Sequence, residues 1–109
     1  MAWLAAQPNA PAWAKEDLRG LMFVPAHDEE AVIAANVRSL LGQDYPRRLF
    51  DVYVVADHCT DDTPRRAAAA GAKVLVRNRG RADGKPGALN WAWALLGRDI
   101  DRYDAVVIV

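Results

Sequence analysis

The sequence is poor in several features that would point to particular classes of protein. It has a single cysteine in 109 residues, which excludes an intramolecular disulfide framework and a zinc site built from several cysteines. Its 14 basic residues balance 14 acidic residues, so it lacks the positive excess on which nucleic-acid binding by bulk charge relies. We therefore expect a cytoplasmic protein without a nucleic-acid partner.

Long apolar runs are also missing. No segment approaches the roughly 20 consecutive apolar residues of a membrane-spanning helix, and the first residues have no basic segment that would open a signal peptide. What is present is a hydrophobic fraction of 52%, ample for the core of one domain. Residues 1–19 show no sustained hydrophobic period, and we expect them to form a lead-in to that domain.

From residue 20 onward, short apolar runs alternate with segments of helical period. The expected strands are residues 21–24, 50–56, 73–76 and 105–109, and the expected helices are residues 28–41, 60–70 and 86–96. Strands that alternate with helices of this length favour right-handed crossovers and parallel pairing. The sequence therefore predicts a three-layer α/β/α fold with a mostly parallel, Rossmann-like sheet.

The last expected helix carries two tryptophans with different predicted surroundings. Helical spacing puts Leu89, Trp93 and Leu96 on one face, which we expect to pack on the sheet. Trp91 points away from that face, so we expect it to pack on another segment.

Ligands of open α/β sheets bind beyond the carboxyl ends of the strands, so the segments after the expected strands are candidate sites. Residues 25–30, Pro-Ala-His-Asp-Glu-Glu, carry three carboxylates where a dinucleotide-binding turn would carry glycines. Such acids suit ribose hydroxyls or base N–H groups better than phosphate. Capping of the following helix is the alternative interpretation.

Asp57 stands where the second expected strand ends. A carboxylate at this edge can accept an N–H from a nucleobase, and a turn aspartate that bonds its own backbone is the alternative. His58 and Cys59 follow directly. We do not expect them to act as base and nucleophile, because adjacent side chains usually diverge and no third orienting group is evident. Nor do they make a transition-metal site without further spaced ligands.

A basic, glycine-rich loop precedes the last expected helix. Its basic residues are Arg77, Arg79, Arg81 and Lys85. Backbone donors, positive charge and a helix N-terminus together suit a diphosphate. The spacing is not that of a P-loop, and a solvated charged connection is the alternative.

Taken together, four segments resemble the start of family 2 glycosyltransferases of the GT-A fold, especially the cellulose and poly-N-acetylglucosamine synthase branch. Residues 24–30 resemble the opening strand and its P-A-x-N-E-E turn, and residues 43–46 resemble the Q-x-Y-P turn. Residues 54–63 resemble V-V-D-D-x-S-T-D-D-T, and residues 84–90 resemble G-K-x-x-A-L-N. We therefore expect residues 20–109 to be the donor-nucleotide-binding part of a GT-A domain, incomplete at its C-terminus.

The resemblance implies transfer of a sugar, with inversion, from a nucleotide-sugar (most often a UDP-sugar) to a glycan or another hydroxyl acceptor. It implies six nucleotide-binding residues: Pro25, Ala26, Asp28, Glu30, Asp57 and Lys85. Within this set Asp57 would contact the uracil and Lys85 the diphosphate. Ala56 stands where the family has the first aspartate of a pair, so one acid remains for the base.

The resemblance further implies a Mg²⁺ or Mn²⁺ ion, held by D-x-D acids that would follow Val109. Neither these acids nor the catalytic base lie within residues 1–109, so we expect no catalytic residue and no metal ligand in this chain. The resembled branch is usually attached to a membrane. A longer form of the protein would therefore lie at the inner face of the plasma membrane.

Two other classes of function remain open on the sequence. A non-catalytic nucleotide-binding or regulatory module would bind nucleotide without a metal ion. A phosphoacceptor receiver domain fits the size and the clustered acids. However, receivers place the acceptor aspartate after the third strand, whereas Asp57 ends the second and the third ends in Arg77.

Overall fold

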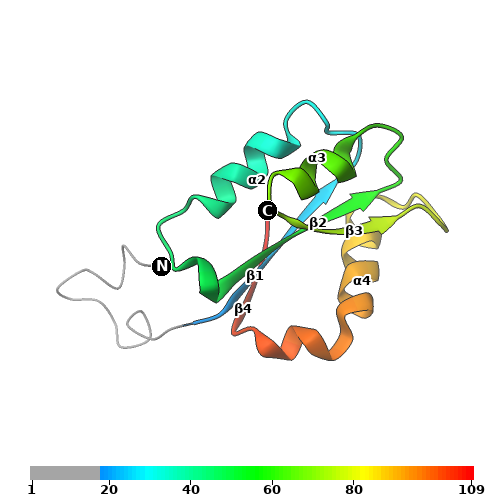
Figure 1. Ribbon diagram of the computed structural model, residues 1–109. Helices are drawn as coiled ribbons and strands as arrows, with labels where there is room; N and C mark the ends of the chain where they lie inside the picture. The colour runs from blue at the N-terminus through cyan, green and yellow to red at the C-terminus, as the bar shows by residue number, and fades with distance from the viewer. Residues whose placement is uncertain (1–17) are drawn as a thin grey trace.

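The computed structural model describes residues 18–109, so the predicted lead-in of residues 1–19 lies almost entirely outside the described residues. A parallel sheet carries helices on both faces (Figure 1). In chain order the elements are β1 (Gly20–Ala26), α2 (Ile33–Leu41), η2 (Arg47–Leu49), β2 (Phe50–Asp57), α3 (Thr63–Ala69), β3 (Lys73–Arg77), α4 (Gly84–Leu96), η3 (Gly97–Arg102) and β4 (Ala105–Ile108). The predicted α/β class is confirmed.

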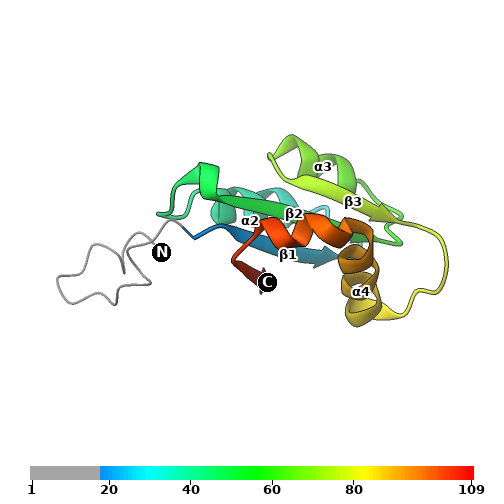
Figure 2. The same cartoon turned by 90° about the horizontal axis from the view of Figure 1, so that it is seen from below.

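The strand order is β3-β2-β1-β4, with every neighbouring pair parallel. The chain therefore steps outward from β1 to β3 and then returns past its starting point to β4. Because crossovers are right-handed, this reversal moves the returning helix to the opposite face of the sheet. Figure 2 shows α3 on one side of the strands and α4 on the other.

Strands β1 and β2 are covered on both faces, which explains their nearly continuous apolar sequences. One core cluster joins Val24 and Val54 to Ile33 and Val37 of α2. The cluster on the opposite face joins Leu21, Phe23 and Val55 to Ala88 and Ala92 of α4. The central strands are therefore fixed from both sides, and their carboxyl ends are held in place.

The prediction for the packing face of α4 was confirmed for Leu89 and Leu96, which pack against the core, and was wrong for the two tryptophans. Ala88 and Ala92 are fully buried against the sheet, whereas Trp93 is 49% exposed. Trp91, expected to point away, packs against the core cluster on this face. Two alanines let the helix approach the strands closely, and an indole ring between them would hold it off. The Trp93 ring instead lies beside the core, with its centroid 6.4 Å from that of Phe23.

Helices α2 and α3 both begin later than predicted, because the residues before them form two loops that bind each other. Asp28 accepts the backbone N–H of Thr60 at 2.7 Å, and Glu30 accepts that of Asp62 at 2.9 Å. Neither helix has a side-chain hydrogen bond at its N-cap. The acids therefore connect one loop to the other.

Within residues 18–109, no helix has the length and apolar character to cross a membrane.

The loop ties depend on a buried hydroxyl. Thr63 is fully buried; its Oγ1 accepts the backbone N–H of Glu29 at 2.8 Å and donates to Asp61 at 2.5 Å. We expect Thr63→Val to lower the free energy of unfolding by about 2 kcal/mol, since it leaves a backbone N–H unpaired inside the protein. Urea unfolding measures this change.

Thr60→Val is the matched control, because the exposed Thr60 hydroxyl also donates to an aspartate, at 3.2 Å. Its loss should be much smaller, and Thr63→Ser should retain most of the stability. Equal losses for the two valine variants would contradict the role given to Thr63.

Candidate functional site

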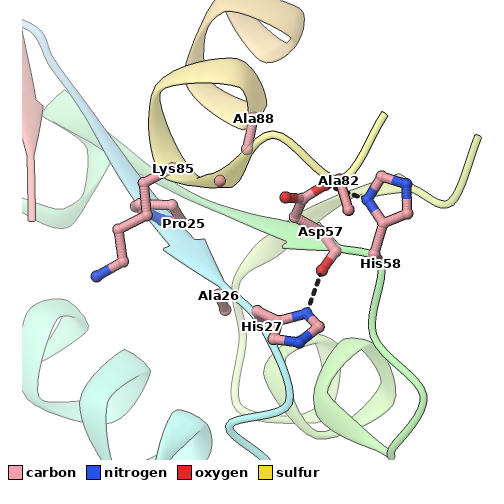
Figure 3. A pocket seen from close by; sticks show the side chains of 9 residues that line it. Pro25, Ala26, His27, Asp57, His58, Ala82, Lys85 and Ala88 are labelled. Atoms are coloured by element: carbon pink, nitrogen blue, oxygen red, sulfur yellow. Dashed lines mark hydrogen bonds and ion pairs between the residues drawn. The ribbon is translucent and has the colours of Figure 1, made fainter. Parts of the chain in front are cut away.

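A cavity of about 220 Å³ opens at the carboxyl ends of β1 and β2, against the start of α4 (Figure 3). It is lined by Pro25, Ala26, His27, Asp57, His58, Ala82, Gly84, Lys85 and Ala88. Four of the six residues predicted to bind nucleotide, namely Pro25, Ala26, Asp57 and Lys85, therefore line the same cavity. This is the edge of the sheet at which α/β proteins bind ligands.

The carboxylate of Asp57 is the most strongly held group of the site. Arg77 donates to it twice, from Nε to Oδ1 at 2.7 Å and from a terminal nitrogen to Oδ2 at 3.1 Å. Asp57 is 7% exposed and Arg77 is 8% exposed. The pair forms because the two residues are register partners at the ends of β2 and β3. Two parallel hydrogen bonds between a guanidinium and a carboxylate fix orientation as well as charge.

The pair extends into a row of charges. Arg77 also donates to Asp83 of the following loop at 2.7 Å. Its hydrogen bonds to Asp57 and Asp83 raise the pKa of Arg77. The Arg77 hydrogen bonds, followed by that of His58, hold the pKa of Asp57 below its usual value despite burial. Asp57 is therefore an ionised acceptor at neutral pH.

Two histidines, which the sequence did not single out as binding residues, contact Asp57, one at its backbone carbonyl and one at its carboxylate (Figure 3). His27 Nδ1 donates to the backbone carbonyl of Asp57 at 2.8 Å. This hydrogen bond and the nearby charge of Asp28 raise the pKa of His27. His58 Nδ1 lies 2.7 Å from Asp57 Oδ1. The only sequence signal for either residue is its place directly after a strand on the ligand-binding edge.

Asp28 and Glu30 do not line this cavity. Their carboxylates turn toward residues 58–62 and hold the two loops together. Their contact with a nucleotide stays a prediction. Among the basic residues of the loop, Arg77 is buried against Asp57, so it supports the site from behind this carboxylate and is not part of the solvated loop.

Lys85 lies between two cavities. It borders the cavity of Asp57 and a second one of about 370 Å³, lined by Glu29, Asn36 and Val109 among others. In Figure 3 the Lys85 amine extends away from Asp57. A ligand that contacts both side chains must therefore present a hydrogen-bond donor at one end and negative charge at the other.

The buried pair predicts a specific loss of stability. Asp57→Asn should lower the free energy of unfolding at pH 7 by on the order of 3 kcal/mol, because the buried guanidinium keeps only one anionic partner. Asp83→Asn, at a side chain 43% exposed, should cost much less.

The pH dependence of this loss has a definite sign. The folded-state pKa of Asp57 is depressed, so its contribution is present above the unfolded-state pKa and is lost as the pH falls through the folded-state pKa. The difference between wild type and Asp57→Asn in urea unfolding should therefore shrink on acidification. A difference independent of pH would contradict an ionised Asp57.

Comparison with curated proteins finds relatives that are much longer than this chain. It is 37% identical over 90 residues to beta-monoglucosyldiacylglycerol synthase of Nostoc sp. strain PCC 7120, covering 77% of this chain and 19% of the relative. It is 32% identical over 85 residues to the UDP-forming cellulose synthase 1 catalytic subunit of Komagataeibacter xylinus, covering 77% of this chain and 11% of the relative. The chain thus spans a fifth or less of these relatives.

Solved structures share the fold. Glucosyl-3-phosphoglycerate synthase from Mycobacterium tuberculosis, in complex with Mg²⁺ and UDP, matches with a TM-score of 0.63 and 31% identity over 84% of this chain and 32% of that one. The mannosyltransferase PcManGT from Pyrobaculum calidifontis, in complex with GDP-Man and Mn²⁺, matches with a TM-score of 0.62 and 28% identity over 72% of this chain and 24% of that one. The sequence model of glycosyl transferase family 2 matches residues 22–100. This chain therefore belongs to glycosyl transferase family 2.

Proposed function

We propose that this protein takes part in the transfer of a sugar from a UDP-sugar to a hydroxyl acceptor, and that the cavity beside Asp57 binds the uracil end of the donor. Membership of the family supports the reaction class. The observation that carries the assignment of the cavity is the ionised, nearly buried carboxylate of Asp57 at its wall. Such a group is stable there only as an acceptor of hydrogen bonds.

One oxygen of Asp57 has room for a ligand. Among the described residues, Oδ1 accepts from Arg77 and from His58, whereas Oδ2 accepts from Arg77 alone. A carboxylate oxygen accepts two hydrogen bonds, so Oδ2 retains one position. The N3–H group of uracil is a single donor that fits this position.

The size of the cavity favours a pyrimidine over a purine. Its volume of about 220 Å³ lies below the roughly 300–1,000 Å³ of sites that enclose a drug-sized ligand. It therefore suits one ring with the remainder of the ligand outside. The diphosphate would extend toward Lys85 and the N-terminus of α4, where positive charge and free backbone N–H groups attract anions.

Divalent cations accompany the nucleotide in the solved neighbours, which hold Mg²⁺ or Mn²⁺. Among the described residues, Asp28, Cys59 and Asp61 lie close enough together to be considered as metal ligands, but they do not fit such an ion. Asp28 accepts backbone N–H groups of residues 60 and 61, and Asp61 accepts from Thr63 and from the backbone of residue 30. A thiol is also a poor ligand for these hard cations. We assign no metal ligand and no catalytic base to residues 18–109.

The acceptor belongs to the proposal as a class only. The names of the relatives point to two kinds of product, a glucosylated diacylglycerol and cellulose, and thus to a lipid or a glycan acceptor. We infer a glycan hydroxyl, an inverting transfer and a place at the inner face of the plasma membrane from the likeness to the cellulose synthase subunit. Retention of the anomeric configuration in the product would overturn the inverting assignment.

Substitution of Lys85 distinguishes the contribution of the diphosphate to binding affinity from that of the nucleoside. We expect Lys85→Ala to weaken UDP binding about tenfold, the effect of one lost charge-assisted contact of about 1.4 kcal/mol. Uridine, which has no phosphate, should bind wild type and variant alike. Isothermal titration of both ligands measures the contrast.

Arg98→Ala is the matched control, because Arg98 is an exposed cation of η3, beyond the far end of α4. It should leave both affinities unchanged. Equal losses of UDP and uridine on Lys85→Ala would refute the diphosphate assignment, and a wild-type protein that binds neither ligand would refute the proposed donor.

A further inference from the structure

His58 occupies a backbone conformation that few side chains adopt. Its φ is +51°, in the left-handed region that non-glycine residues rarely enter. The turn sends the chain sharply away from β2, while the backbone N–H of His58 still donates to the carbonyl of Arg77 at 2.7 Å. The imidazole is thereby brought back over the carboxylate of its own neighbour, Asp57 (Figure 3). Backbone strain of this kind persists where the surrounding contacts fix it.

The imidazole bridges two acceptors. Its Nδ1 lies 2.7 Å from Asp57 Oδ1, and its Nε2 lies 3.1 Å from the carbonyl oxygen of Gly80. A carbonyl and an ionised carboxylate only accept hydrogen bonds. A neutral imidazole has one N–H, whereas the imidazolium has two. Only the protonated ring makes both hydrogen bonds.

The bridge connects an exposed loop to a buried strand. Asp57 ends a strand that is covered on both faces, whereas Gly80 lies in the exposed loop of residues 78–83 between β3 and α4. This loop contributes Ala82 to the cavity wall and leads directly into Lys85. The side chain of Asp83 also connects this loop to the site, by accepting a hydrogen bond from Arg77. His58 is therefore one of two side chains, with Arg77, whose hydrogen bonds hold the 78–83 loop against the site.

We infer that His58 is a positioning residue for the donor nucleotide: its protonated ring orients Asp57 and closes the 78–83 loop over the cavity. The inference rests on the proposed function of that cavity. The charged groups nearest the ring are Asp57 of β2, its partner Arg77 of β3, and Asp83 of the loop, which Arg77 also contacts. Two further titratable groups, His27 after β1 and Lys85 of α4, line the same cavity. The carboxylate of Asp57 directly contacts the ring.

Loss of the proton has a predictable direction. The remaining N–H stays on Nδ1, because its partner is a charged carboxylate and that hydrogen bond is the stronger one. The lone pair of Nε2 then faces the Gly80 oxygen, and two acceptors at hydrogen-bonding distance repel each other. The loop is released while Asp57 keeps its Arg77 contacts. Donor affinity therefore falls when the ring loses this proton.

The test measures the affinity for UDP-glucose at pH 5.5 and pH 8.0. This probe has no phosphate monoester, so its own charge does not change over the range. Wild type should bind roughly fivefold more weakly at the higher pH, the factor that one net hydrogen bond contributes. His58→Gln should bind with one affinity at both values, and that affinity should be close to the weaker wild-type one.

His27→Gln is the matched control, because His27 also titrates at this wall and has a raised pKa. It should keep the wild-type ratio between the two pH values. A His58→Gln variant with the wild-type ratio, or a ratio that disappears in His27→Gln, would overturn the inference. If wild type binds no UDP-glucose at either pH, the proposed function fails.

A ligand-free readout tests the bridge separately from the proposed function. In ¹H–¹⁵N spectra, the backbone signals of the 78–83 loop should shift with the same midpoint as the ring nitrogens of His58. The same signals should not titrate in His58→Gln. Loop signals whose chemical shifts do not change when His58 gains or loses its proton would show that the ring does not hold the 78–83 loop in place.

Discussion

The buried ion pair between Asp57 and Arg77 is the interaction on which the rest of the site depends. Both groups are more than nine-tenths removed from solvent, so each is costly without the other. The pair joins the ends of β2 and β3 and holds one carboxylate in an ionised state at the wall of the cavity. Asp83 and His58 attach the neighbouring loop to the same pair. The loop, the cavity wall and the charge of the site are therefore parts of one hydrogen-bonded structure.

The site separates two kinds of recognition along one edge of the sheet. At one end, a fixed carboxylate in a small cavity suits a donor N–H on a planar ring. At the other end, Lys85 and the start of α4 suit negative charge. The fold creates this separation, because the chain reverses its direction of travel after β3 and places α4 on the opposite face from α2 and α3. A ligand that lies across the ends of β1 and β2 then meets both ends of the site.

The loops at this edge are held by tertiary hydrogen bonds more than by helix caps. Acids that local sequence assigns to the first turns of helices instead accept backbone N–H groups from the facing loop. The buried Thr63 hydroxyl serves both sides of this contact. A ligand-binding edge built in this way is ordered before the ligand arrives, which lowers the entropic cost of binding. The strained backbone of His58 belongs to the same arrangement.

The sequence by itself determined the kinds of elements, their order and the family, because hydrophobic period, turn residues and spaced motifs are local properties. It also located Asp57 and Lys85 on the ligand-binding edge, since both directly follow or begin an element. Only the tertiary structure decided which groups meet. Arg77 became the partner of Asp57 through the register of β2 and β3, and His58 reached its own neighbour through a left-handed turn. The buried face of α4 was decided by the space above the sheet, which buries Ala88 and Ala92 completely and leaves Trp93 half exposed. Register, backbone strain and packing distance arise between segments far apart in the chain, so no local pattern encodes them.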